Sequence, residues 1–427
     1  MIGKTPQTAA SVSVKGMAGT STATAPRMGT FASLQIRDYR LLWWGMIVSN
    51  IGTWMQMVAQ GYLVYQLTGS PFMLGLVGFV RAVPVFTFSL FAGVVADRVD
   101  RRKLLLVTQT LAGVFALILG VLTSMGVITV PIIMVLAFAS AAVASFDNPT
   151  RQALVPDIVG KQYIANAVAL QSAAFNGTGI LGPSLAGLSL GFIGIAACFY
   201  INAISFLAVI IALWMMSSIP NKVRRKQTMF QNLREGFGYV RGNRTVAALL
   251  ILIALVGLLG RPYTQLMPAV QRDVLHVGAT GLGILMAFSS IGALIGALAI
   301  ASLSDFKHRG LLLMGSIAVF GVALISFSLS RSFPLSLGLL VLVGGGATMS
   351  MSTTNMLIQL NVPGEFRGRI MSMYTMIAMG MMPLGSMLLG TIADFIGVPV
   401  TLLMGGVGCL VALAVINLWV PTARNET

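Results

Sequence analysis

The chain alternates between long apolar runs and short polar turns. Twelve of these runs are long enough to cross a bilayer as helices, at about 20 residues per ~30 Å of hydrocarbon. Six precede a polar linker and six follow it: 41–66, 72–96, 104–125, 127–146, 163–190, 192–218, then 245–271, 282–303, 311–330, 334–359, 370–392 and 398–420. The pattern predicts an all-α integral membrane protein with twelve transmembrane helices.

The composition agrees with a membrane protein. Of the 427 residues, 56% are apolar and only 9% are charged, whereas about a quarter of the residues in a soluble domain are charged. The two cysteines, Cys198 and Cys409, lie inside apolar runs without the spacing of a metal site. We therefore expect them to be packing residues, and we expect neither a metal nor a cofactor.

The net charge of +16 has a topological explanation. All but four of the 27 lysines and arginines fall in the terminal segments, the linker and alternate turns. Such a bias places those segments in the cytoplasm. It predicts a flexible cytoplasmic tail at 1–36, a cytoplasmic linker at 219–244 and a cytoplasmic tail at 421–427, so both termini lie inside. Nucleic acid is not expected as a partner.

The two halves repeat each other. Asp97 and Asp305 are 208 residues apart in similar basic turns, and Pro183 and Pro383 are 200 apart in glycine-rich runs. Parallel repeats of this kind suggest two six-helix bundles, 37–218 and 245–420, related by a pseudo-two-fold axis along the membrane normal. Such a pair can rock about a site near the midplane.

The turn between the second and third runs carries a recognisable motif. It contains Gly93, Asp97, Arg98, Arg101 and Arg102 in the spacing Gly-xxx-Asp-Arg-xx-Arg-Arg. With the layout of six helices, linker and six helices, this turn resembles the signature of the major facilitator superfamily. The resemblance covers about residues 37–420 and implies the major facilitator fold.

A second segment narrows the resemblance. Residues 146–157, together with Asn166 and Ala167, are similar to the branch that contains the enterobactin exporter and related efflux proteins. That branch implies export across a bacterial inner membrane by a monomeric transporter, with proton antiport as the driving mode.

The resemblance also assigns a role to the charged turns. It implies that Asp97 pairs with Arg101, with a residue near the end of the run at 127–146 and with the start of the run at 370–392, which latches the cytoplasmic gate. The remaining candidate gating residues are Asp147 and Arg151 in the first half and Asp305 and Arg309 in the second. Alternatively, these turns only set the topology and their charges are solvated.

The fifth run, 163–190, carries a row of small residues. Gly179, Gly182, Pro183 and Gly187 partly match the antiporter motif of drug and siderophore exporters. Small residues also allow close helix packing in lipid, so packing alone remains an alternative interpretation.

Polar side chains within the runs suggest a substrate cavity. By analogy with the fold, the runs at 41–66, 127–146, 245–271 and 334–359 surround it. The candidate lining residues are Asn50, Trp54, Gln60, Arg81, Asn176, Arg261, Tyr263, Gln265 and Asn355. Cations within a membrane are costly and mark a pathway or a partner. No acidic residue lies clearly in the midplane, so Arg81 and Arg261 either bond backbone carbonyls or hold an anion.

No catalytic constellation can be built. The chain lacks a GxxxxGK[ST] phosphate loop, which excludes an ATP-driven pump of that type. We therefore expect a secondary exporter, not an enzyme, which moves a small siderophore-like or drug-like amphiphile by alternating access. Its partners would be the lipid bilayer, the substrate and protons. The alternatives are a non-transporting receptor or assembly protein on the same fold, and a lipid flippase.

Overall fold

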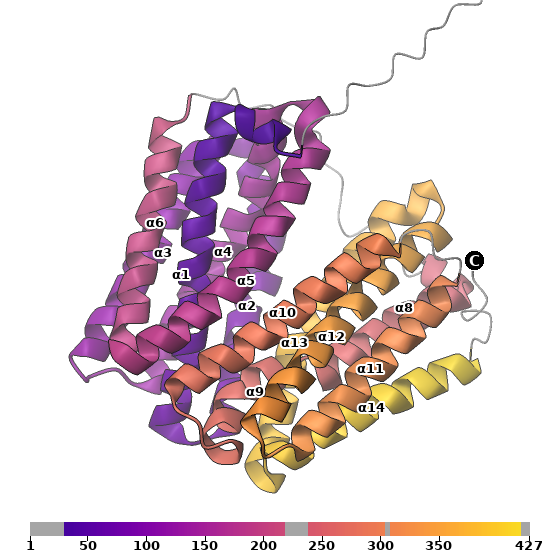
Figure 1. Cartoon of the computed structure of the whole chain (residues 1–427). Coiled ribbons are helices and arrows are strands. Elements are labelled where there is room, and N and C mark those ends of the chain that lie inside the picture. Colours follow the sequence, from indigo (N-terminus) through magenta and orange to yellow (C-terminus); the bar gives the residue numbers. More distant parts are fainter. Residues whose placement is uncertain (1–29, 218–237, 304–307, 420–427) are drawn as a thin grey trace, which may run out of the picture.

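The computed structural model describes residues 30–217, 238–303 and 308–419. Every regular element in these residues is helical (Figure 1). The predicted tails before residue 30 and after residue 419 lie outside the described residues. So do residues 218–237 of the predicted linker and the predicted gating residue Asp305.

The first half of the chain forms one bundle. Its elements are η1 (Ala32–Gln35), α1 (Arg37–Thr68), α2 (Pro71–Arg98), α3 (Arg101–Ser124), α4 (Val130–Val159), η2 (Lys161–Tyr163), α5 (Ile164–Phe192) and α6 (Ile195–Met215). Helix α1 packs on α5 and α6, α3 packs on α4 and α6, and α2 packs on α4. At the start of α3, the Asp100 carboxylate accepts a hydrogen bond from the backbone N–H of Arg102 at 2.9 Å, which caps the helix.

The second half forms a similar bundle. Its elements are α8 (Arg244–Leu255), the π-helical η3 (Val256–Gly260), α9 (Tyr263–Ala269), the π-helical η4 (Val270–Val274), α10 (Ala279–Ser302), α11 (Arg309–Leu329), α12 (Phe333–Asn361), α13 (Gly364–Ile396) and α14 (Val398–Trp419). The run predicted as one regular helix at 245–271 is therefore interrupted. The break lies at Arg261 and Pro262, where proline has no N–H for the helical ladder.

Ten of the described helical segments are long and apolar enough to cross a membrane. The segment from α8 to η4 counts as one of them, Arg244–Val274. Helices α1 and α5, with 32 and 29 residues, have sufficient length but contain no stretch as apolar as those of the ten. With these two, the described residues contain the twelve predicted spanning segments.

The contacts between the bundles follow the internal repeat. Helix α2 of the first bundle packs on α13 of the second. Its repeat equivalent, α10 of the second bundle, packs on α5 of the first. In the first pair, a Cβ added to Gly75 would lie 2.2 Å from the carbonyl oxygen of Ser386. In the second, a Cβ added to Gly283 would lie 2.4 Å from the Cα of Gly187. Gly75 and Gly283 are 208 residues apart, the same offset that relates Asp97 to Asp305.

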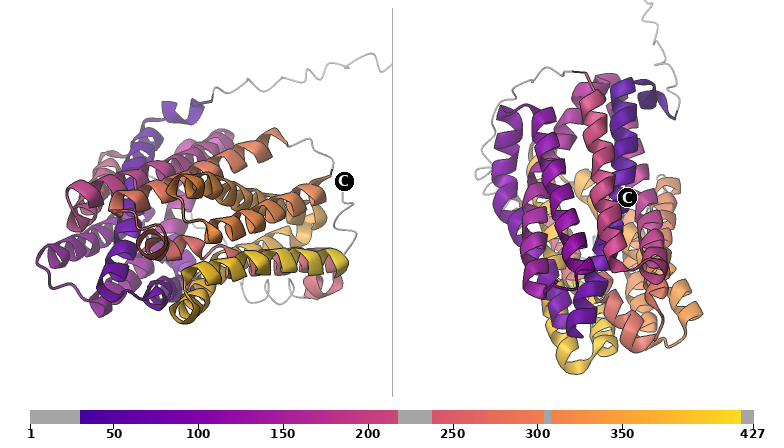
Figure 2. Two further views of the ribbon diagram at one scale, coloured as in Figure 1. Left: turned by 60° about the horizontal axis from the view of Figure 1, so that its bottom comes forward. Right: turned by 90° about the vertical axis from the view of Figure 1, so that its left-hand side faces the viewer.

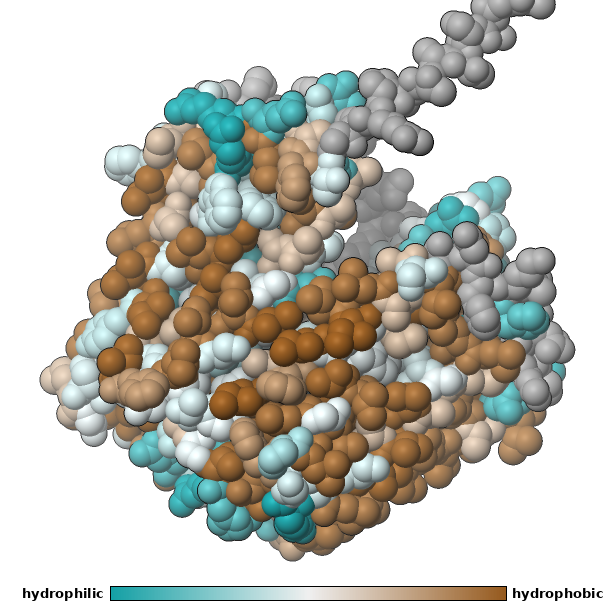
Figure 3. All heavy atoms as spheres, in the orientation of Figure 1, coloured by the Kyte–Doolittle hydropathy of each residue, from teal (hydrophilic) through white to brown (hydrophobic). Residues whose placement is uncertain are grey.

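The bundles meet at one end and separate at the other. Figures 1 and 2 show two packs of helices that converge where α2 and α10 begin and diverge where α1 begins. We call these the closed end and the basic end, after the arginines of the latter. On the face that Figure 3 shows, apolar residues cover the middle of the molecule, hydrophilic residues gather at both ends, and the bundles are separated at the basic end.

Two boundaries differ from the prediction. Helix α4 continues to Val159, well beyond the predicted end at residue 146, because its polar last turns bond to α3 instead of remaining in water. Residues 30–36, predicted to belong to a flexible tail, include η1. Ser33 in η1 donates its hydroxyl and its backbone N–H to Asn166 of α5, at 2.7 and 3.0 Å.

Candidate functional site

A cavity of about 620 Å³ lies between the two bundles. Its lining comes from both halves of the chain, including Trp54, Met57, Val58, Gly61, Gly78, Arg81, Ala82, Val85, Phe86, Asn148, Pro183, Arg261, Tyr263, Thr264, Gln265, Met267, Pro268, Met286, Ser289, Ser290, Thr348, Met379, Met382 and Pro383. The volume lies within the usual range for small-molecule sites, about 300–1,000 Å³. Because both bundles contribute, any relative movement of the bundles changes this space.

Two arginines give the cavity its charge. Arg81 on α2 is partly buried and makes no hydrogen bond or ion pair with any residue that the structure describes. Arg261, at the break between η3 and α9, donates from Nη1 to the sulfur of Met351 at 3.4 Å. Among the described residues that line the cavity, none is acidic. The site is therefore electropositive.

The rest of the lining is largely apolar. Trp54 packs on Phe175 with ring centroids 5.8 Å apart, and several methionines add adaptable surface. Hydroxyls supply hydrogen-bonding capacity: Tyr263 and Ser289 lie 2.6 Å apart through their oxygens. A ligand with an apolar body and a few polar groups fits such a lining.

The structure brings together five of the nine predicted cavity residues. Trp54, Arg81, Arg261, Tyr263 and Gln265 all line the cavity.

The remaining four, Asn50, Gln60, Asn176 and Asn355, are not among the residues that line it. Gln60 is 3% exposed and its Nε2 has no hydrogen-bond partner among the described residues. Asn355 accepts from Nε2 of Gln359 at 2.6 Å, one turn along α12. On α10, Ser289 and Ser290 line the cavity although sequence reasoning missed them, because an isolated serine pair in an apolar helix gives no signal.

The glycines of the antiporter-like motif make room for neighbours on both sides. A Cβ added to Gly182 would lie 2.3 Å from the Cβ of Trp54, so α5 and α1 touch there. A Cβ added to Gly179 would lie 3.7 Å from the same indole, and one added to Gly187 would lie 2.7 Å from the Cα of Gly283 in the other bundle. The motif thus connects the cavity wall with the contact between the bundles.

At the basic end, Arg101 and Arg102 bond to other residues of the first bundle. Arg101, 6% exposed, pairs with Asp157 near the end of α4 and also donates to the carbonyl of Ala153 at 3.4 Å. Arg102 donates to the carbonyl of Trp214 at 2.9 Å. These bonds tie α3 to α4 and α6.

A second group at that end is centred on Asp147. This buried carboxylate accepts from Thr108 Oγ1 at 3.0 Å and Gln109 Nε2 at 2.8 Å, and it lies 3.3 Å from the Arg151 guanidinium. Arg309, at the start of α11, belongs to the second bundle.

The side chains of Asp97 and Arg98 and the surroundings of Gly93, in the last turns of α2, lie outside the described part of the structure. Their predicted gating role therefore remains a prediction.

At the closed end, polar contacts cross from one bundle to the other. The Tyr65 hydroxyl of α1 donates to the Asp273 carboxylate of η4. The guanidinium of Arg272 lies 5.7 Å from the centre of the Tyr65 ring and donates to the Tyr65 carbonyl at 3.4 Å. Ser70 donates to Asp394 of α13 at 2.8 Å.

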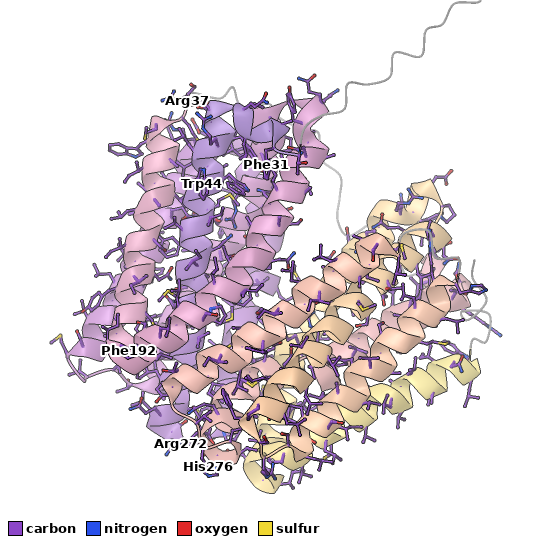
Figure 4. The ribbon with its side chains drawn as sticks, viewed as in Figure 1. Phe31, Arg37, Trp44, Phe192, Arg272 and His276 are labelled. Carbon is purple, nitrogen blue, oxygen red and sulfur yellow. The ribbon has the colours of Figure 1, made fainter. Side chains whose placement is uncertain are left out.

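Figure 4 shows Arg272 and His276 at this end, far from Arg37 at the basic end. We call the contacts of Tyr65, Ser70, Arg272, Asp273 and Asp394 the closed-end latch. Sequence reasoning missed it. The only signal was the presence of charged residues in turns that are otherwise poor in charge.

Comparison with known proteins agrees with this architecture. The sequence profile of the transmembrane secretion effectors, a family of the major facilitator superfamily, matches residues 28–426. The chain belongs to this family. As a transmembrane secretion effector it is a multi-pass membrane transporter and not an enzyme, and the predicted major facilitator fold is confirmed.

Curated relatives match nearly the whole length of this chain. It is 27% identical over 364 residues to the staphyloferrin A transporter of Staphylococcus aureus, which covers 84% of this chain and 90% of the relative. It is 25% identical over 399 residues to the multidrug efflux pump Tap of Mycolicibacterium fortuitum, covering 90% and 96%. Among solved structures, the nucleoside transporter NupG superposes with a TM-score of 0.74 at 13% identity, covering 90% and 99%.

Proposed function

We propose that this effector exports a small amphiphile across the bacterial inner membrane by alternating access. One observation carries the proposal: the cavity is shared by two bundles that meet at one end and diverge at the other. A rocking movement that opened the closed end would transfer the cavity from one side of the membrane to the other. A siderophore transporter and a multidrug efflux pump among the relatives support a siderophore-like or drug-like cargo.

The basic end is the cytoplasmic end in this proposal. Positive charge gathers where α1 begins and α3 begins, and such charge stays inside. Both termini and the linker are then cytoplasmic. The described conformation is open inward, with the cavity ready to load from the cytoplasm.

Asp97 would latch the basic end in the opposite, outward-open state. The pairing of Arg101 with Asp157 supports this role, because it holds the start of α3 rigidly against α4 next to Asp97. A latch that forms in one state and breaks in the other biases a two-state element. Asp147 and Arg151, and Asp305 and Arg309, would add to it.

Proton antiport is the proposed driving mode. The antiporter-like motif supports it through position: its glycines lie between Trp54 in the cavity wall and α10 across the bundle contact. Since no acidic residue is among the described cavity residues, the coupling carboxylate would lie at a gate and not beside the substrate.

The test uses inside-out membrane vesicles that contain the effector, with fluorescent amphiphiles as probes. We expect uptake that an acidic lumen drives and that nigericin, which dissipates the pH gradient, abolishes. Asp97→Asn should abolish uptake. Asp100→Asn in the same turn should keep it, because asparagine also caps a helix.

Each alternative gives a different result. Binding without uptake would indicate a receptor or assembly protein, and movement of labelled lipids alone would indicate a flippase. Uptake that ignores nigericin would remove antiport and keep transport. A single hydrodynamic species of monomer size would support the proposed monomer.

A further inference from the structure

We infer that the cavity selects a substrate by an anionic group of the carboxylate class, held by Arg81 from one bundle and Arg261 from the other. This inference rests on the proposed role of the cavity as the substrate site. It adds a chemical class to that role: an apolar molecule with a carboxylate, and not a lipophilic cation or a neutral lipophile.

Arg81 provides the first observation. Its guanidinium carries five donors, yet it makes no hydrogen bond or ion pair within the described residues. It lies on α2 between Gly78 and Ala82, which also line the cavity. A charge removed from bulk water without a partner is costly. An anionic ligand would supply the missing partner.

Arg261 provides the second observation. Its recorded partner is the Met351 thioether, and sulfur is a weak acceptor. The π-helical η3 and the following proline place this arginine at a break in the helical segment, where it faces the cavity. Most of its donors therefore remain available to a ligand.

The surroundings of the two arginines decide the sign of the ligand. No acidic side chain is found among the cavity-lining residues that the structure describes, so no internal anion neutralises the site. A lipophilic cation would meet two positive charges, whereas a carboxylate matches the fork geometry of a guanidinium. Trp54 and the methionines would hold the apolar body.

The position of the arginines on opposite bundles has a consequence for transport. Two like charges in one cavity, one from each bundle, resist approach of the bundles. A shared carboxylate removes that resistance, so binding of the anion favours the occluded state. Loading the cargo and closing the cavity become the same event.

The experiment measures binding to the purified effector with three probes on one fluorescent core: pyrenebutanoate, its methyl ester and the corresponding pyrenyl amine. Energy transfer from tryptophan to pyrene reports binding, since Trp54 lies in the cavity wall. We expect the carboxylate to bind at least tenfold more tightly than the ester, or about 1.4 kcal/mol. The amine should bind most weakly.

The variants assign the preference to the two arginines. Arg81→Gln and Arg261→Gln should each reduce the affinity for pyrenebutanoate about tenfold and leave ester binding unchanged, which also shows that the cavity is folded. Arg81→Lys should restore part of the affinity. Arg40→Gln removes an exposed charge at the start of α1 and should change nothing. Competition against pyrenebutanoate by benzoate, inorganic phosphate and chloride tests for a free anion site. If phosphate or chloride competes as well as benzoate, the arginines do not select an organic carboxylate and the inference is overturned.

The inference is overturned if the ester or the amine binds as tightly as the carboxylate, or if both glutamine variants keep the preference. The outcome is separate from that of the proposed function. Arginine-dependent binding without vesicle uptake would contradict transport and leave anion recognition intact. Equal uptake of all three probes would support transport and contradict anion recognition.

Discussion

The closed-end latch gives the most direct test of the inward-open assignment. Tyr65→Phe removes one hydroxyl, the donor to Asp273 in the other bundle, and keeps the ring that lies beside Arg272. A hydrogen bond to a charged group contributes about 1.5–3 kcal/mol. Asp273 is exposed, so the lower end of that range applies. Each 1.4 kcal/mol corresponds to about a factor of ten. The ratio of molecules whose bundles touch at the closed end to molecules whose bundles are apart there should therefore fall roughly tenfold.

Spin labels on the two bundles can measure this ratio. Phe192→Cys at the end of α5 and Phe395→Cys near the end of α13 place labels at the closed end, where the native side chains are 82% and 85% exposed. Both native cysteines are buried and should not react. In pulsed dipolar spectra, Tyr65→Phe should enlarge the long-distance population at this pair.

A matched control separates the latch from a general loss of a hydroxyl. Tyr200 at the closed end lies 2.9 Å from Ser124 through their oxygens, and both residues belong to the first bundle. Tyr200→Phe should therefore leave the distance distribution unchanged. The reasoning is refuted if the two tyrosine variants give the same distribution. It is also refuted if Tyr65→Phe and Asp273→Asn have additive effects, because a direct bond requires coupling of about 0.5 kcal/mol or more.

Two further predictions concern packing and charge. Gly75→Ala places a Cβ 2.2 Å from a backbone carbonyl of α13, so it should force the closed end apart, at a cost of about 1–3 kcal/mol. Gly177→Ala on α5, with nothing within 4 Å, should be neutral or stabilising in the same spin-label and thermal assays. Asp157→Asn removes the carboxylate through which Arg101 ties α3 to α4, so the free energy of unfolding should fall by about 1.5–3 kcal/mol, which a lower unfolding temperature reports. Adding Arg101→Gln should restore part of the lost stability. If neither variant changes the unfolding temperature, the pairing is contradicted.

The sequence predicted the fold because a bilayer permits few solutions. Every spanning segment must be long, apolar and helical, so the apolar runs locate the helices directly. The local exceptions depended on contacts that no single run contains. The extension of α4 to Val159 depends on Thr108 and Gln109 of α3. Pro262 indicates a break in the helical segment at Arg261 and Pro262, but no sequence signal indicates the π-helical geometry beside it.

The cavity was harder to predict than the fold. A polar residue in a spanning helix identifies a costly position but not the direction it faces, because that direction depends on how the helix is rotated in the bundle. Trp54 and Asn50 lie one turn apart on α1, yet only Trp54 lines the cavity. The closed-end latch was missed for a related reason: Tyr65 and Asp273 are 208 residues apart and only the tertiary structure joins them.

Helix α2 connects the three functions assigned above. Near its start, Gly75 contacts α13 at the closed end; in its middle, Arg81 lines the cavity; near its end, Asp97 belongs to the basic turn. The first and third are related by the internal repeat to Gly283 and Asp305, but Arg81 is not, since Ser289 and Ser290 occupy that region of α10. In the proposed mechanism, the repeat accounts for symmetric opening and closing, and the asymmetry of the charge within it accounts for the selection of the cargo. A variant that loses Arg81 should still rock between states, but it should do so without responding to a carboxylate.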